Sequence, residues 1–217
     1  MSCVAMSNFA KFVKLFRENP YAAASLVKAF LRGSVNILYY KCVNPRVVIK
    51  QPFFVYEKFE VSGPGRVCID ANCSIFPSVF RGVSIITLTP QAEVRIGNYC
   101  SFGGMMIRCQ REVEIGDRAM AGYSLIQDTL FTEDLNLCEN NYGQNAQTDS
   151  GVKIGKNVWI GAHSCILQNT RIGDDSVISL GAVCRNMEVK DYHLASGNPC
   201  RHSLPIARIV QYRGASK

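Results

Sequence analysis

The chain has 217 residues, of which 47% are hydrophobic and 19% charged, and this composition excludes a disordered protein. Its length suits one sizeable core, or one domain with a small appendage. The net charge of +7 is confined to residues 1–50, which hold eight Lys or Arg and one acid, so an anionic partner of the fold as a whole is expected there.

The sequence also limits where the protein works and what it binds. No apolar run is long enough to span a bilayer, and "MSCVAMSNFAKFVKLF" lacks the order of a secretory signal, so a cytoplasmic protein is expected. The ten cysteines include no CxxC pair, and the three histidines do not flank cysteines at ligand spacing. We therefore predict neither a disulfide framework nor a bound metal.

Residues 1–64 are predicted to form a basic, helical N-terminal arm. The segment "SNFAKFVKLFRENP" places Phe9, Phe12 and Phe16 at helical spacing, and "AAASLVKAFLRGSVNILYYK" can continue as a second helix until Gly33. Two interpretations stay open: a helix that covers the end of the following domain, or a basic amphipathic helix in peripheral contact with an anionic membrane. No nucleic-acid partner is expected, because no recognised nucleic-acid module is present.

An isoleucine falls on every sixth residue at Ile154, Ile160, Ile166, Ile172 and Ile178. Neither a helix nor a lone strand has this period, so the chain must turn a corner once in each six-residue unit, here called a beat. Four residues after each Ile the side chain is small or compact. Three beats would complete one triangular coil, and stacked coils would pair strand on strand in parallel. Hexapeptide repeats of this kind are the signature of a parallel β-helix.

Weaker beats extend the β-helix over residues 65–205. The tetrapeptides VCID, VRIG, VEIG and VKIG begin at Val67, Val94, Val113 and Val152. Gly, Asn or Asp in "IGKN" and "IGDD" are expected to supply unusual backbone angles at the corners. The 39 residues from Val113 to Val152 fit two coils plus three residues, or one coil plus an excursion. We predict an excursion loop at 129–150 and a C-terminal tail at 206–217.

Residues 65–205 resemble the hexapeptide-repeat acyltransferases through "VKIGKNVWIGAHSCIL", "RIGDDSVISLGAVC" and "ASGNPCR". Within that family they look closest to sugar and polysaccharide O-acetyltransferases, with maltose, galactoside and xenobiotic acetyltransferases as relatives. The resemblance implies an all-β fold, a left-handed parallel β-helix shaped as a triangular prism. It also implies a homotrimer, acetyl-CoA as donor, and active sites in clefts between neighbouring prisms.

On the donor side, the resemblance implies that Trp159, Ala162 and Leu180 line the coenzyme groove. It also implies that Arg185 and Arg201 contact the phosphates, for which guanidinium groups are suited. The alternative is that Trp159 only packs between coils and that the two arginines are solvated surface.

On the acceptor side, the family motif resembles "IMDTDFH" and ends in a histidine that acts as general base. The matching stretch here is "IQDTLFTED", in which Thr132 takes the place of that histidine. We interpret His163 as the replacement base, with Asp128 as a nearby carboxylate. His163 is expected one coil away from Ser124, and Tyr123 and Ser124 are the candidate contacts for the acceptor.

Two functions stay open. The first is an acetyl-CoA-dependent O-acetyltransferase that modifies a sugar or surface-polysaccharide precursor, including a lipid-linked saccharide. The alternative is a catalytically inactive trimeric β-helix that serves as a binding or assembly module, which the missing histidine favours. A metalloenzyme of the carbonic anhydrase type is excluded, because His163, His193 and His202 are not spaced to converge between coils.

Overall fold

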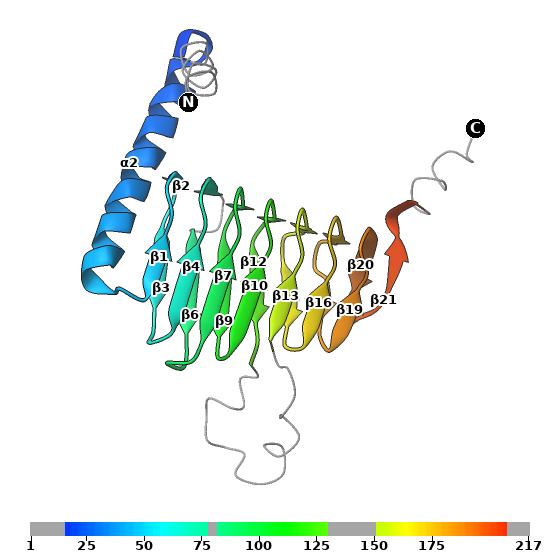
Figure 1. Ribbon diagram of the computed structural model, residues 1–217. Helices are drawn as coiled ribbons and strands as arrows, with labels where there is room; N and C mark the ends of the chain where they lie inside the picture. Colours follow the sequence, from blue (N-terminus) through cyan, green and yellow to red (C-terminus); the bar gives the residue numbers. More distant parts are fainter. Residues whose placement is uncertain (1–15, 78–81, 130–150, 208–217) are drawn as a thin grey trace, which may run out of the picture.

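The computed structural model describes residues 16–77, 82–129 and 151–207. Helix α2 (Pro20–Val43) is followed by a stack of coils that forms a long prism (Figure 1). Most of the predicted excursion loop lies outside the described residues, as do Thr132 and the first fifteen residues of the arm. Residues 208–217 of the predicted tail also lie outside them.

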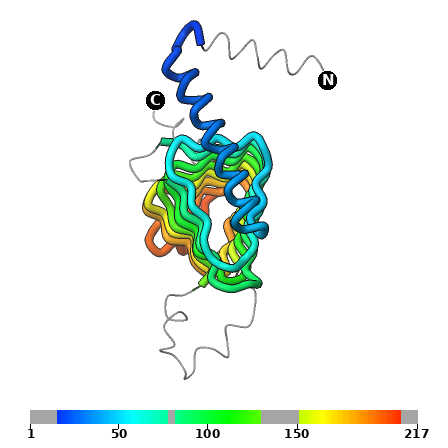
Figure 2. The backbone as a smooth tube through the Cα atoms, turned by 90° about the vertical axis from the view of Figure 1, so that its left-hand side faces the viewer, coloured from blue at the N-terminus to red at the C-terminus, as the bar shows by residue number. Residues whose placement is uncertain are grey.

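Three sheets form the three faces of the prism, which Figure 2 shows end-on. The first sheet contains β1 (Val47–Ile49), β4 (Arg66–Ile69), β7 (Glu93–Ile96), β10 (Glu112–Ile115), β13 (Val152–Ile154), β16 (Thr170–Ile172) and β19 (Met187–Val189). The second contains β2 (Phe53–Val55), β5 (Cys73–Ile75), β8 (Ser101–Phe102), β11 (Met120–Ala121), β14 (Trp159–Ile160), β17 (Val177–Ile178), β20 (His193–Gly197) and β21 (Cys200–Pro205). The third contains β3 (Phe59–Ser62), β6 (Val83–Thr87), β9 (Met105–Cys109), β12 (Ser124–Gln127), β15 (Ser164–Leu167) and β18 (Val183–Cys184).

Equivalent residues of successive coils lie directly opposite one another. Ile96 pairs with Ile115, and Ile115 pairs with Ile154, and all three side chains are buried in the prism. Because Val113 pairs directly with Val152, the 39-residue interval holds one coil and an excursion rather than two coils. The predicted all-β, left-handed parallel β-helix is confirmed.

The compact residues that follow each Ile fill the interior beside the corners, as predicted. Cys100, Ala119, Ser176 and Ala182 are each fully buried. The thiol of Cys100 donates to the Gly116 carbonyl at 3.2 Å, so this cysteine acts as a small, satisfied core residue.

The corner prediction is correct for Asn and Asp and wrong for the Gly that directly follows Ile in these motifs. Asn157 and Asp175 adopt left-handed φ values of 55° and 55°, and Gly116 is not among the residues with positive φ. Gly116 is needed for a different reason: a Cβ there would lie 2.7 Å from the Gly155 backbone of the next coil. The glycine after each Ile therefore permits close stacking of coils, and the left-handed turn comes two residues later.

Helix α2 covers the first coil of the prism (Figures 1 and 2). Tyr40 is buried, and its hydroxyl accepts a hydrogen bond from the Val61 backbone at 2.7 Å. The predicted boundary at residues 64/65 is wrong, because β1 already pairs with β4 in parallel register from Val47. Residues 47–62 lack the Ile-Gly signature, so only their pairing with the next coil identifies them as part of the prism. At the other end, β21 turns back antiparallel to β20 and ends the stack.

Candidate active site

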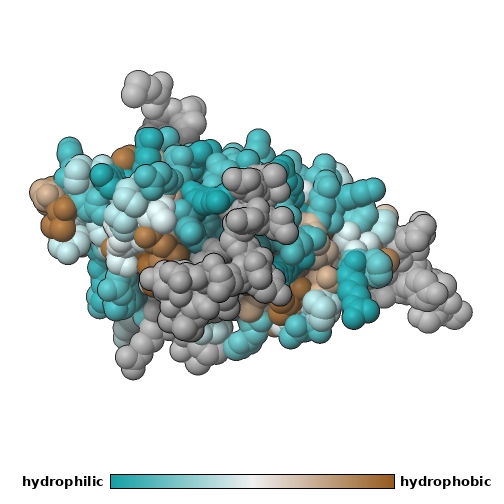
Figure 3. Space-filling model, turned by 90° about the horizontal axis from the view of Figure 1, so that it is seen from below, coloured by the Kyte–Doolittle hydropathy of each residue, from teal (hydrophilic) through white to brown (hydrophobic). Residues whose placement is uncertain are grey.

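The three faces of the prism differ in the side chains that they present outward. The first sheet is charged, with Arg95 between Glu93 and Glu112 at 2.9 and 3.2 Å. The second sheet presents Met120 and Trp159, which are neighbours in adjacent strands and largely exposed. The third presents Met106 beside Leu125. Hydrophobic patches between hydrophilic regions are visible in Figure 3.

The outward apolar ladders on the second and third sheets were missed by sequence reasoning. Their signal is the residue that precedes each inward-facing residue of a strand, as Met120 precedes Ala121 and Leu125 precedes Ile126. Exposed apolar patches of this kind are typical of surfaces that another molecule covers.

Two aromatic rings meet at the corner between the second and third sheets. Tyr123 lies between β11 and β12, and His163 lies between β14 and β15 on the next coil. The His163 backbone N–H donates to the Tyr123 carbonyl at 2.5 Å, and the ring centroids are 5.4 Å apart in an edge-on arrangement of 68°. Both side chains are exposed. The corner therefore presents an imidazole and a phenol together on the surface.

The predicted register of Ser124 with His163 is wrong by one residue. Ser124 pairs with Ser164, and His163 stands over Tyr123. The reason is that the corner after β14 contains one residue more than the corner after β11, and His163 absorbs it in a left-handed conformation with φ of 59°. The Ser124 hydroxyl is buried and has no hydrogen-bond partner among the described residues.

Asp128 is buried just before the excursion and bound by backbone groups. Its carboxylate accepts from the N–H groups of Gln110, Arg111 and Glu112 at 2.6, 2.7 and 2.8 Å. Burial raises the pKa of the Asp128 carboxyl, and the three backbone donors oppose that shift. The geometry favours a role in holding the corner after β9, and the predicted catalytic role of Asp128 stays a prediction.

The predicted donor-binding residues Trp159, Ala162 and Leu180 lie on two successive coils near this corner. Trp159 is 60% exposed and Leu180 is 75% exposed. The Ala162 carbonyl accepts a hydrogen bond from Gly181 at 3.0 Å, which links the two corners. Side chains this large and this exposed do not pack within a coil, so Trp159 is not the coil-packing aromatic of the alternative reading.

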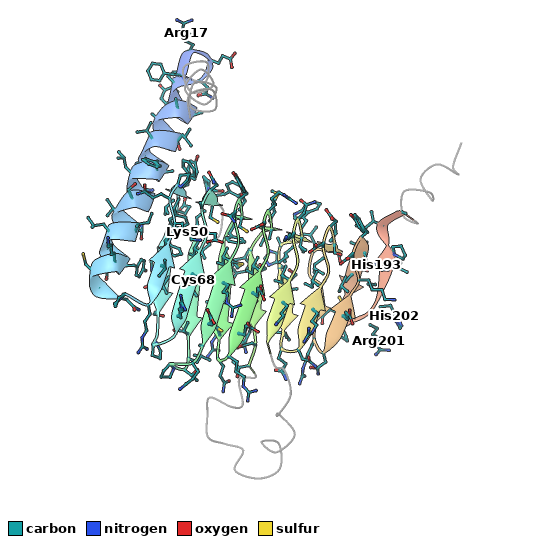
Figure 4. All side chains as sticks on the ribbon, viewed as in Figure 1. Arg17, Lys50, Cys68, His193, Arg201 and His202 are labelled. Atoms are coloured by element: carbon teal, nitrogen blue, oxygen red, sulfur yellow. The ribbon has the colours of Figure 1, made fainter. Side chains whose placement is uncertain are left out.

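The two arginines predicted to bind phosphate are not brought to the same corner. Leu180 precedes β18 and Arg185 follows it, so they lie at opposite ends of that strand. Arg201 is exposed on β21, near the C-terminal end of the stack, where Figure 4 also shows His193 and His202. A ligand that reached both Leu180 and Arg185 would run along the outward face of the third sheet, past Val183.

The described residues place no group of three or more His, Cys, Asp or Glu where it could hold a metal ion. His193 lies apart from His163, and its Nδ1 is 2.8 Å from the Asp191 carbonyl. Among the described residues no helix is both long and apolar enough to cross a membrane.

Comparison with known proteins agrees with the fold. Residues 151–186 match the family model described as bacterial transferase hexapeptide (six repeats), which confirms the predicted resemblance to hexapeptide-repeat transferases. A Staphylococcus aureus protein named as an acetyltransferase is 36% identical over 70 residues, 32% of this chain and 34% of that protein. The galactoside O-acetyltransferase of Lactococcus lactis is 30% identical over 135 residues, 61% of this chain and 59% of that protein. The matches thus span about a third and just over half of these relatives.

Solved structures share the fold at low identity. An AntD variant from Bacillus cereus, an N-acyltransferase crystallised with dTDP and coenzyme A, superposes with a TM-score of 0.58. The two chains are 20% identical, and the match covers 83% of this chain and 96% of AntD. This likeness supports the β-helix architecture.

Proposed function

We propose that the chain is an acetyl-CoA-dependent O-acetyltransferase that acts on a hydroxyl of a saccharide. The observation that carries the proposal is the exposed imidazole of His163 beside Tyr123, at a corner flanked by the exposed apolar side chains Trp159 and Leu180. The relatives named as acetyltransferases, one of them a galactoside O-acetyltransferase, support the reaction and the acceptor class.

In the proposed reaction His163 takes the proton from the acceptor hydroxyl, and the oxygen attacks the thioester carbonyl carbon. The C–O bond forms, the C–S bond breaks, and the imidazolium returns its proton to the leaving thiolate. Backbone N–H groups at the corner stabilise the carbonyl oxygen while it carries negative charge. Transfer is direct and needs no covalent enzyme intermediate.

The donor is proposed to lie with its apolar arm against Trp159 and Leu180 and its phosphates toward Arg185. Apolar contact with the pantetheine arm would bury side chains that are otherwise exposed to water. Arg185 can be reached along the third sheet, and Arg201 is the second candidate for phosphate contact.

The active unit is proposed to be a homotrimer in the cytoplasm. The apolar ladders of the second and third sheets flank the Tyr123–His163 corner, and two such faces on each of three prisms would cover one another around a threefold axis. Each candidate site would then lie in a cleft between two prisms, and the charged first sheet would face water.

A trimeric binding module without catalysis is the second candidate. It is favoured by Thr132, which takes the place of the family's catalytic histidine, and by the engagement of Asp128 with three backbone N–H groups. Under this proposal the corner would bind a ligand without transferring an acyl group.

Two measurements separate the candidates. Calorimetric titration with acetyl-CoA is expected to show binding at micromolar to sub-millimolar strength. Release of free thiol is then followed with galactosides and other saccharides, and with an amino sugar that tests N-acylation. Binding with turnover supports the enzyme, and binding without turnover supports the module. If a folded trimer does not bind acetyl-CoA, the enzyme proposal is wrong.

A further inference from the structure

Helix α2 is apolar on two opposite sides. The inner side packs on the first coil, where Gly33 approaches the Phe53 carbonyl too closely for any side chain, and Ala29 is buried. Arg32 holds the helix in place by donating to the Tyr56 carbonyl at 2.8 Å. Between Ala29 and Tyr40 this side is covered by the first coil.

The opposite side exposes a stripe of large apolar side chains. Val27, Leu31, Val35 and Leu38 recur at intervals of four, four and three residues, which places them on one face of the helix. They are 42%, 58%, 66% and 63% exposed. A row of four such side chains along a surface helix normally indicates that something covers it.

A shallow apolar hollow of about 320 Å³ continues this stripe toward the start of the helix. It is lined by Phe16, Ala23, Ala24, Val27 and Leu31, and Lys28 is the charged residue among those that line it. In Figure 1 this half of α2 rises beyond the prism, and every residue that lines the hollow belongs to the segment 16–31.

The charges around the stripe identify the kind of partner. Lys28, Arg32 and Lys41 are the ionised groups of α2, which contains no Asp or Glu. The excess positive charge of the chain is confined to residues 1–50, and the remainder is neutral overall. Tyr21 and Tyr39 are also exposed on α2, and tyrosine favours the boundary between apolar and aqueous phases.

We propose that the stripe and the hollow together form a docking surface for an anionic lipid bilayer. Helix α2, about 36 Å long, would lie in the interface with Val27, Leu31, Val35 and Leu38 among the acyl chains. Lys28 and Lys41 would contact lipid headgroups, each adding about 1 kcal/mol of attraction, or about fivefold in partitioning. A second copy of the helix fits less well, because it offers no acidic side chain to meet these lysines.

The test is sedimentation of the full chain with vesicles of phosphatidylcholine, with and without one third phosphatidylglycerol. Binding is expected to anionic vesicles and to weaken when salt is raised. Leu31→Glu and Val35→Glu should each weaken it at least tenfold, and Lys28→Gln and Lys41→Gln about fivefold each. Leu204→Glu and Lys190→Gln, exposed residues of the far end of the chain, are the matched controls and should leave it unchanged.

Circular dichroism establishes that each variant is folded before its binding is compared. The proposal is overturned if the folded protein does not bind anionic vesicles, or if Val35→Glu and Leu204→Glu bind alike. If the unmodified protein does not bind vesicles and Leu31→Glu changes its oligomeric state, the stripe contacts a second copy of the chain instead. None of these outcomes depends on acyl transfer, so failure here leaves the proposed reaction standing.

Discussion

The imidazole of His163 stands edge-on over the phenol ring of Tyr123, one coil away, with 5.4 Å between the ring centroids. The backbone hydrogen bond between the same two residues fixes the corner that carries both rings. This arrangement keeps an ionisable group at the surface of a prism whose interior is filled by apolar side chains, and it defines where transfer is expected.

Replacement of His163 by Ala is expected to lower kcat by about 10²- to 10⁴-fold, because the acceptor hydroxyl would lose its general base. The affinity for acetyl-CoA should be retained, since the coenzyme is proposed to bind through other side chains. Steady-state kinetics and calorimetry measure the two effects. His193→Ala, on β20 and apart from this corner, is the control. Equal activity of both variants would remove His163 from the mechanism.

Acetyl-CoA is expected to change the fluorescence of Trp159, which is the only tryptophan in the chain. Within the proposed cleft between two prisms, the pantetheine arm would contact its indole. Trp159→Ala and Leu180→Ala should each weaken binding about tenfold, or 1.4 kcal/mol. Tyr192 is an aromatic residue of similar exposure at a corner of the first and second sheets, and Tyr192→Ala should leave acetyl-CoA binding unchanged. Unchanged fluorescence at saturating acetyl-CoA would place the donor elsewhere.

Gly116 and Gly181 are expected to respond differently to Ala. A Cβ at Gly116 would press on the Gly155 backbone of the next coil, and relieving that overlap should cost about 3 kcal/mol. Gly181 has open space around it but a left-handed φ of 68°, so the cost should be about 1 kcal/mol. Urea unfolding at one fixed protein concentration measures both. The reverse order would contradict the stacking argument.

Asp117 is expected to make the free energy of unfolding depend on pH. Its Oδ1 accepts from the Asn98 backbone at 2.7 Å, and this hydrogen bond lowers the pKa of the carboxyl. The ionised group therefore stabilises the fold above its ordinary pKa of about 3.9, and that contribution is lost as the pH falls through the lower folded value. Asp117→Asn should reduce the urea midpoint more at pH 6 than at pH 3. Glu188→Gln, which also removes one negative charge, is the control. If Asp117→Asn lowered the urea midpoint equally at pH 6 and at pH 3, the assignment would be contradicted.

The fold could be predicted because its signal is local and repeated. Each Ile that opens a beat, from Ile69 to Ile178, occupies the same inward position, so one period over a few coils predicts the architecture. The site could be predicted only in part. Trp159 and Leu180 were selected by the resemblance alone; both are exposed, and their contact with the donor stays a prediction.

The amino-acid sequence by itself determined the β-helix and the direction of its inward side chains, because the six-residue period is set by neighbours along the chain. Only the tertiary structure decided which side chains meet across coils. One extra residue after β14 moved His163 from Ser124 to Tyr123, and Asp128 found its three donors on the preceding coil. Residues 47–62 form a coil of the prism because their strands pair with the next coil. Their own sequence lacks the Ile-Gly signature and therefore did not predict this pairing.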